Sequence, residues 1–528
     1  MGYCALLVNI GLFYMKQIWV KIIDTQKSII TLLQYTDLLY KVYVQQMKYP
    51  ASLRPGQGKI QTSFPIIAIT FCISFLDSQT LDIALPRIQH ELDLSRSTVQ
   101  WLGSITTLLT AATVIPISRI CQRLGYVLVF KISTMLIFLL QITFFMTKSI
   151  FWLMLSIRLI LGVGFAGISA SRYVMYKVLP METNQKSYIQ ISVVITQVIS
   201  LITPIISGAI IQYLYYKYSY LVMACLSLIG FFCLLFFQNN SSPIKIQQDI
   251  LGSFCIILSI GALCLAFTFI SIGYYYIAVT IFVLFVVFSL LLIFTEKKVQ
   301  NPLIPSAISV QPLLQIIIVD FNNNIILSAL NYILPQYSAL IHEPTTMSSF
   351  IFTLIASFSL IISIIIPIIQ TKVLNYHIIL ASTISIVLLS IGIFFTQYDK
   401  NTFYILYCCI QVFCQIIYTV VYPLLLLSIP FKHYSNLSAV PTVCRTIGHS
   451  LSLNMFSMIQ QLTAKYYTGK SAEQFGYLIC FLFFVPLSII NGLLAWLKIG
   501  ASETEKYKIG YKPSMVRVVV EDENENLI

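Results

Sequence analysis

Few charged side chains interrupt the long apolar runs of this sequence, and those few have types that could move protons. Asp77 and Asp82 lie in the first run, and Arg158 lies in the fourth. Asp320 and Arg445 lie in the ninth and the thirteenth. A charge in apolar surroundings is costly, so such a residue usually faces the interior of a helix bundle and marks a path for an ion or a substrate. These residues are the first candidates for function.

Matching depths predict two ion pairs. At about 1.5 Å of rise per residue, Asp77 and Arg158 lie at similar depths below the same end of their predicted helices. Asp320 and Arg445 each lie about 14–16 Å from the opposite end. We therefore predict that Asp77 pairs with Arg158 and that Asp320 pairs with Arg445. Asp82, nearer the end of its predicted helix, is expected to point in a different direction from Asp77.

Each predicted pair has two interpretations. In the first, the pair only holds two helices together. In the second, the carboxylate takes up and releases a proton when its cationic partner moves, because burial favours the neutral acid and a nearby cation favours the ionised one. The second interpretation would couple a flow of protons to the movement of a solute.

Amide side chains gather around Asp320. The run Asp320–Asn324 reads DFNNN, and more amide and phenol groups follow it. Polar groups within a membrane-spanning helix must face protein or water rather than lipid. We therefore predict a polar, partly aromatic solute cavity. Its predicted lining residues are Asp320, Asn322, Asn323, Asn331, Arg445 and His449, the last of which follows Arg445 by one helical turn.

The composition and the apolar runs of the chain indicate membrane-spanning helices, which set the positions of these residues. It has 528 residues, of which 58% are hydrophobic and only 10% are charged, whereas a soluble chain carries about 25% charged residues. About 20 apolar residues are needed to span a bilayer. The sequence holds about fourteen such runs. They lie near 64–86, 98–118, 127–147, 150–174, 188–213, 219–238, 250–271, 274–294, 311–334, 347–370, 376–396, 403–429, 436–462 and 475–497.

The basic residues indicate how the helices are oriented. The net charge is +13, but Lys and Arg lie between the apolar runs rather than in one patch, so a nucleic-acid partner is not expected. With fourteen spans and a cytoplasmic amino terminus, the inner loops and both tails hold most of the Lys and Arg, as the positive-inside rule requires. We therefore predict a multi-pass protein of the plasma (cytoplasmic or inner) membrane with both termini in the cytoplasm.

The two ends differ from the rest. Residues 1–60 are predicted to be an amino-terminal extension, either an amphipathic segment on the membrane surface or the result of a start placed too early, with Met47 the true start; we favour the second. Residues 501–528 finish with the acidic sequence EDENENLI and are predicted to form a disordered cytoplasmic tail. The polar break Glu296–Pro305 is taken as the boundary between two halves.

One motif points to a different function but lacks the required context. Gly162, Gly164 and Gly167 spell G-x-G-x-x-G, which binds dinucleotides only between a strand and a helix. Here the glycines lie within an apolar helix, so we interpret them as sites of close helix packing. The sequence holds no phosphate loop, no HExxH motif and no Cys-x-x-Cys spacing among its 12 cysteines. We therefore expect no cofactor, no metal ion and no enzyme activity.

Five segments share their order and spacing with known motifs. The first run contains LDSQTLDIALP (Leu76–Pro86), and the loop after the second contains SRICQRLGYVLVFK (Ser118–Lys131). RLILGVGFAG (Arg158–Gly167), TPIISG (Thr203–Gly208) and NLSAVPTVCRTIGHSLSL (Asn436–Leu453) follow. Over residues 60–497 the sequence thereby resembles the fourteen-helix drug:proton antiporters of the major facilitator superfamily.

Three departures from the motifs of this family stand out. In the first-helix motif, Leu-Asp-x-Thr-x-Val-Asn-x-Ala-Leu-Pro, Gln79 replaces the Thr and Asp82 replaces the Asn. In the loop motif, Gln122 replaces the usual Asp. The resemblance assigns roles to six matching residues. They are Asp77 and Arg158 for proton coupling, Arg123 and Gly125 for a gating loop, and Pro204 and Gly208 for the antiporter motif.

The resemblance also implies a fold: an all-α integral membrane protein with two six-helix bundles of the major facilitator type plus two inserted helices, about 14 transmembrane helices in all. The bundles would comprise residues 61–240 and 301–500, with the inserted pair and a linker in residues 241–300. Spans 250–271 and 274–294 agree, because they contain few polar side chains beyond Ser, Thr and Tyr.

The function that the resemblance implies is proton-coupled efflux of amphiphilic or hydrophobic small molecules, as in multidrug transporters. Its partners would be the solute, protons and the lipid bilayer, and the protein is expected to be a monomer. An alternative within the same superfamily is a metabolite importer or exchanger. An alternative of another class is a membrane scaffold or receptor that does not transport.

Overall fold

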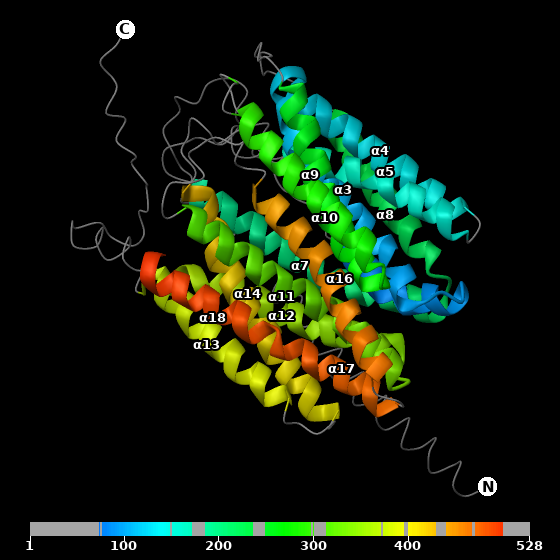
Figure 1. The fold of residues 1–528 in the computed structure, drawn as a ribbon, viewed down its shortest axis with the longest axis vertical. Coiled ribbons are helices and arrows are strands. Elements are labelled where there is room, and N and C mark those ends of the chain that lie inside the picture. The colour runs from blue at the N-terminus through cyan, green and yellow to red at the C-terminus, as the bar shows by residue number, and fades with distance from the viewer. Residues whose placement is uncertain are drawn as a thin grey trace, which may run out of the picture. The chain divides into compact units, whose positions relative to one another are not determined.

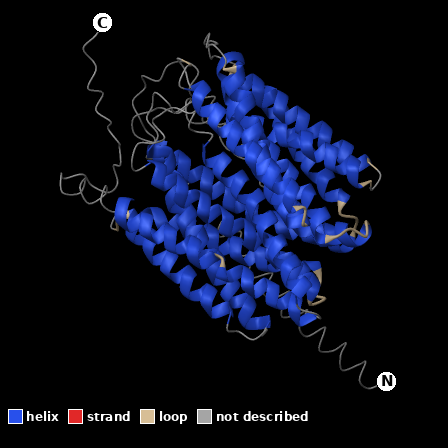
Figure 2. Ribbon diagram, in the orientation of Figure 1, coloured by secondary structure: helices blue, strands red, loops and turns tan. Residues whose placement is uncertain are grey.

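The computed structural model describes residues 73, 76–147, 150–171, 185–235, 249–296, 299, 313–370, 373–394, 400–428, 440–466 and 470–499. All of them belong to one compact unit, Ser63–Ile528. The predicted extension 1–60, the predicted tail 501–528 and most of the break Glu296–Pro305 lie outside the described residues, so these predictions stay untested. The described part consists of helices joined by short turns and holds no strand (Figure 2).

The helices follow the predicted apolar runs (Figure 1). A first helix includes residues 76–91. The others are α3 (Arg96–Leu124), α4 (Tyr126–Met146), α5 (Phe151–Ser171), α7 (Gln185–Tyr213), α8 (Lys217–Leu235), α9 (Ile250–Ile272), α10 (Tyr275–Glu296), α11 (Leu313–Leu340), α12 (Thr345–Ile369), α13 (Asn375–Phe394), α14 (Lys400–Ser428), α16 (Val440–Tyr466), α17 (Lys470–Leu482) and α18 (Phe484–Leu494), and a π-helical turn (Ala495–Ile499) follows α18.

Twelve stretches of the described chain are long and apolar enough to cross a membrane. The helix that includes residues 76–91 and the rather polar α16 are not among them, but both coincide with predicted spans. The predicted fold class, an all-helical membrane protein of about 14 spans, is confirmed. The domain boundaries at residues 240, 300 and 500 stay predictions.

Several helices run past the ends expected from hydropathy. The second span was expected to end at residue 118, but α3 continues to Leu124, because helical hydrogen bonding persists until Gly125. Gly125 has φ 96° and alone joins α3 to α4. A glycine suits this position because positive φ strains residues that carry a Cβ atom. At the other end of α3, the side chain of Ser95 caps the helix by accepting from the backbone N–H of Thr98.

The helices alternate in direction, so their connections gather at two ends. We call the end with the turns at residues 92–95, 214–216, 273–274 and 341–344 the Glu91 end. The other end, which includes the turn between α3 and α4, is the Gly125 end. The sequence predicts that the Glu91 end lies outside and the Gly125 end inside the cell, and this orientation stays a prediction.

Two groups of helices pack within themselves and meet along two seams. In the first group, α5 packs on α3 and α4, and α8 packs on α4. In the second, α11 packs on α14, α16 and α18, and α13 packs on α14 and α18. The two groups meet where α3 packs on α16 and where α7 packs on α12. This is the arrangement that positions the site.

Helices α9 and α10, the predicted inserted pair, lie next to the seam between α3 and α16. Helix α10 packs on α9, and α9 packs on both α3 and α16. Asn454 of α16 donates to Thr268 of α9 at 2.9 Å, and both side chains are buried. The rings of Trp101 and Phe269 meet edge to face at 6.3 Å. The inserted pair is thus fixed to helices of both groups.

Small residues set the closeness of the helices. A Cβ atom on Gly162 would lie 2.6 Å from the carbonyl oxygen of Thr106, and one on Gly164 would lie 2.7 Å from Ile137. A Cβ atom on Gly167 would lie even closer to the side chain of Ser133. The G-x-G-x-x-G run therefore lets α5 approach α3 and α4, as the sequence predicted. The hydroxyl of Thr106 donates to the carbonyl of Arg158 at 3.0 Å across this contact.

Candidate functional site

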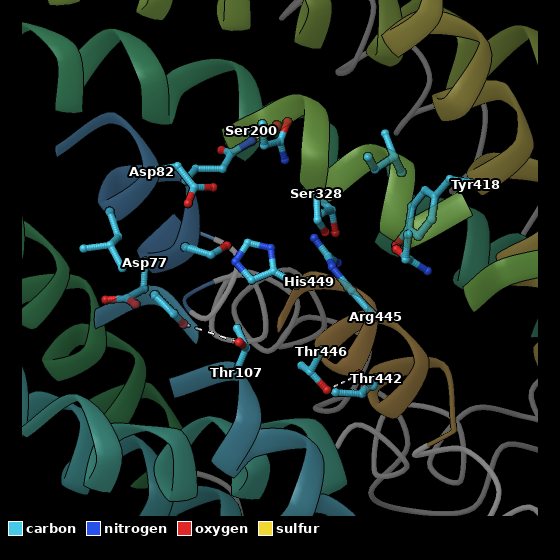
Figure 3. A pocket seen from close by; sticks show the side chains of 18 of the residues that line it. Asp77, Asp82, Thr107, Ser200, Ser328, Tyr418, Thr442, Arg445, Thr446 and His449 are labelled. Carbon is cyan, nitrogen blue, oxygen red and sulfur yellow. Dashed lines mark hydrogen bonds between the residues drawn. The ribbon is translucent and has the colours of Figure 1, made fainter. Parts of the chain in front are cut away.

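A cavity of about 130 Å³ lies between the two groups of helices. Eight helices line it, with the helix at residues 76–91, α3, α5 and α7 on one side and α11, α12, α14 and α16 on the other. Its lining holds five charged side chains and many hydroxyls and amides, together with apolar side chains such as those of Phe165, Leu327 and Phe352. Figure 3 shows Asp82, Arg445 and His449 around one space.

The predicted pair of Asp77 and Arg158 is confirmed. Arg158 Nη1 donates to Asp77 Oδ2 at 2.5 Å, and the two side chains are 0% and 4% exposed. The contact uses one oxygen only, and within the described residues Asp77 Oδ1 has no hydrogen-bond partner. Both residues line the cavity. The pair therefore offers a carboxylate oxygen that can accept a proton beside a fixed cation.

Aromatic rings hold the far side of the Arg158 guanidinium. Its Cζ atom lies 5.4 Å from the ring centre of Tyr220 and 5.7 Å from that of Phe144. Arg158 Nη2 donates to the Tyr220 hydroxyl at 3.3 Å. The two rings lie 4.3 Å apart, centre to centre. Neither ring lines the cavity. The sequence analysis missed both residues, because an aromatic residue in an apolar span carries no distinguishing signal.

The second predicted pair lies on the opposite wall. Asp320 of α11 and Arg445 of α16 both line the cavity, and their charges attract each other. His449, one turn beyond Arg445, lines it as well. Asn331 does so too, and it accepts a hydrogen bond from Gln411 of α14 at 3.0 Å. The structure thus brings the charged residues of both pairs to one cavity.

Two predicted lining residues lie elsewhere. Asn322 donates to Asn491 at 3.0 Å, and Asn323 donates to the carbonyl of Cys414 at 3.1 Å. Neither lines the cavity, because the turn of α11 directs them at α18 and α14. Asn324 takes that place instead, since it lies one turn beyond Asp320 and so shares its face. The spacing of four residues was a signal that could have identified it.

Asp82 also differs from its expected position. The helix continues past Pro86 to residue 91, so Asp82 is not at its end. Although it lies five residues beyond Asp77, Asp82 lines the same cavity and is only 4% exposed. Within the described residues its Oδ1 atom has no hydrogen-bond partner. The cavity wall therefore carries a third carboxylate besides Asp77 and Asp320, and the sequence analysis did not assign it to the cavity.

The two residues predicted to belong to a gating loop lie at the Gly125 end, away from the cavity lining. Arg123 is exposed in the last turn of α3, and Gly125 is the buried single-residue turn after it. The antiporter-motif residues Pro204 and Gly208 lie in α7, and they do not line the cavity either. Gly208 instead packs against Ser349 of α12, with a Cβ atom at position 208 placed 2.5 Å from the Cβ atom of Ser349.

Polar contacts between the two groups concentrate near the Glu91 end. Gln100 of α3 donates to the Tyr332 hydroxyl of α11, which donates to Gln460 of α16 at 3.4 Å. The backbone N–H of Thr345, at the start of α12, donates to Gln212 of α7 at 3.2 Å. The two helix groups are thus hydrogen-bonded to each other between the cavity and the Glu91 end.

Two helix groups around a central charged cavity define a membrane transporter. The family model for the Major Facilitator Superfamily matches residues 67–453, and the chain belongs to this superfamily. A search of curated proteins finds no match.

Solved structures share the fold at low sequence identity. A crystal structure of a D-xylose–proton symporter is 12% identical with a TM-score of 0.58, over 83% of this chain and 97% of that one. The human organic anion transporter MFSD10 (TETRAN) is 12% identical with a TM-score of 0.56, over 84% and 100%. The xylose transporter XylE from E. coli, in a partially occluded inward-open conformation, is 12% identical with a TM-score of 0.57, over 83% and 98%.

Proposed function

We propose that this transporter couples the uptake of a proton by Asp77 to the export of amphiphilic small molecules. The observation that carries the proposal is the Asp77–Arg158 ion pair on the wall of the central cavity. A proton that binds the free Oδ1 atom neutralises the carboxylate and weakens its attraction to Arg158. The helix at residues 76–91 is then less tightly held to α5.

The coupling follows because the ion pair and the solute share one cavity. In the proton-free state the ion pair fixes two helices that line it. After protonation these helices are free to take another arrangement, and the cavity changes its affinity for solute. Binding of solute and binding of proton are then linked, and linkage is reciprocal. Amphiphilic solutes fit this cavity because its lining has both polar and apolar parts.

One observation favours a second candidate, the transport of a polar metabolite. Amide side chains occur on both walls of the cavity, from Gln79 and Gln197 on one side to Gln411, Gln415 and Asn331 on the other. Amides donate and accept hydrogen bonds at once, which suits solutes rich in hydroxyl groups. The two candidates differ in the direction of transport that the proton gradient drives, uptake or efflux. They also differ in the solutes that compete for the cavity.

The test uses purified protein in liposomes with an imposed pH gradient. We expect the gradient to drive export of an amphiphilic dye, and Asp77→Asn to abolish it while leaving the protein folded. Asp93→Asn is the matched control, because Asp93 is an exposed turn residue with φ 48°, a conformation that Asn adopts readily. Undiminished gradient-driven flux in Asp77→Asn would refute coupling through Asp77. Flux of sugars but not of dyes would favour the second candidate.

A further inference from the structure

The Arg158 guanidinium has two neighbours of different kinds on its two sides. On the cavity side it meets Asp77. Behind it stand Tyr220 of α8 and Phe144 of α4, which are 1% and 2% exposed. We call these two rings the aromatic seat. Because the seat lies outside the cavity lining, solute does not need to displace it.

Resting on the function proposed above, we propose that Tyr220 and Phe144 are positioning residues that keep Arg158 in place while Asp77 carries a proton. Proton uptake then releases the helix at residues 76–91 from α5, and the arginine does not follow it.

Electrostatics explains why a seat is needed. Arg158 is fully buried, so a guanidinium that lost its partner would remain shielded from bulk water. A buried charge without compensation is strongly destabilising. The faces of aromatic rings attract a cation, and the attraction grows when water is excluded. The Tyr220 hydroxyl oxygen accepts a further hydrogen bond from Nη2.

The seat favours the protonated state in particular. While Asp77 is ionised, the rings face a pair whose charges largely cancel, and the carboxylate opposes their attraction for the cation. Once Asp77 is neutral, the rings face a cation that has lost its ion-pair partner, and they stabilise it more. Removing a ring therefore penalises the protonated state, so the pH at which coupling is half-maximal should move towards acid.

Few other groups can account for such a shift. Within the part of the chain that the structure describes, the charged and titratable side chains that act on Arg158 are Asp77 and Asp82 from its neighbouring helix and Tyr220 from α8. From α3 the nearest contact is the Thr106 hydroxyl, which binds the backbone of Arg158 rather than its side chain. Asp82 is left unchanged in every variant below, so its charge enters all measurements equally.

The first experiment measures thermal unfolding and needs no transport. Asp77→Asn imitates the neutral carboxyl group, and Tyr220→Leu removes a ring. We expect Tyr220→Leu to lower the unfolding temperature more when position 77 is Asn than when it is Asp. Tyr220→Phe, which keeps the ring, should restore most of the difference. Tyr218→Leu is the matched control, because Tyr218 is 44% exposed on the same helix. Equal losses in both backgrounds would overturn the proposal.

The second experiment measures gradient-driven flux against pH. We expect Tyr220→Leu to move the half-maximal pH by about one unit towards acid, and Tyr220→Phe to move it little. If Tyr220→Leu does not fold, Phe144→Leu carries the same expectation, with the partly exposed Phe145→Leu as its control. A profile that keeps its midpoint and only loses height would overturn the proposal. If the wild type shows no gradient-driven flux, coupling fails, and the unfolding cycle alone decides the seat.

Discussion

Gly208 of α7 lies directly against Ser349 of α12, so that a Cβ atom at position 208 would stand only 2.5 Å from that of the serine. The contact joins the two helix groups at one of their seams. Nearby, the hydroxyls of Thr80 and Ser207 lie 2.8 Å apart and tie the first helix to α7. The last glycine of the antiporter motif thus has a packing reason to be a glycine.

Gly208→Ala should separate α7 from α12 and destabilise the protein by about 1–3 kcal/mol, as overpacking does. The measurement is chemical or thermal unfolding in detergent. Ser349→Gly should restore stability to Gly208→Ala, because it removes the opposing Cβ atom. Gly261→Ala is the control, since no atom lies within 4 Å of its Cβ position. A loss in Gly261→Ala as large as that in Gly208→Ala would contradict the packing explanation.

Tyr332→Phe should loosen the contact between α3, α11 and α16, because it leaves the amides of Gln100 and Gln460 without the hydroxyl between them. We expect a loss of about 1–3 kcal/mol in unfolding free energy, the usual cost of an unsatisfied buried polar group. Tyr275→Phe, on the exposed face of α10, should change nothing. An unchanged stability in Tyr332→Phe would show that this network does not hold the Glu91 end.

Asp82→Asn should behave differently from Asp77→Asn in the same liposome assay. Asp82 lines the cavity, but Asp77 is the residue that forms the ion pair with Arg158. Neutralising Asp82 breaks no such pair, so we expect the unfolding temperature not to fall and the pH gradient still to drive flux. Loss of gradient-driven flux in both variants would place proton coupling on the two carboxylates together.

Asn454→Ala should release α9 from α16, because it removes the hydrogen bond to Thr268. We expect faster hydrogen exchange in α9 and α10, which pack on each other. Helix α13 packs on α14, α17 and α18 and should exchange as before, so it serves as the internal reference. Acceleration spread evenly over α9 and α13 would mean that the bond stabilises the whole fold rather than the inserted pair.

The sequence was enough to predict the helices and one ion pair. A span of about 20 apolar residues has few alternatives in a membrane, and residue counts convert directly into depth. Depth alone therefore brought Asp77 and Arg158 together. Depth says nothing about rotation, which is why Asn322 and Asn323 were assigned to the cavity in place of Asn324.

The remaining parts of the site depend on contacts that have no pattern along the chain. Phe144 and Tyr220 lie in largely apolar helices with little amphipathic contrast, so the sequence pattern does not reveal which face is buried. The meeting of Gly208 with Ser349 joins residues far apart in the sequence. Asp82 was placed near the end of its helix because hydropathy does not fix how far that helix extends beyond Pro86.

The single-residue turn at Gly125 has a mechanical consequence. Helix α3 lies along the seam with α16, and α4 carries Phe144 to the rear of Arg158. Because only one residue separates them, the adjoining ends of the two helices cannot move apart. The two helix ends therefore move together at Gly125, and only rotation about the glycine changes the angle between the helices. A movement of α3 at the seam can therefore act through the backbone on α4, the helix that carries Phe144 to the buried arginine.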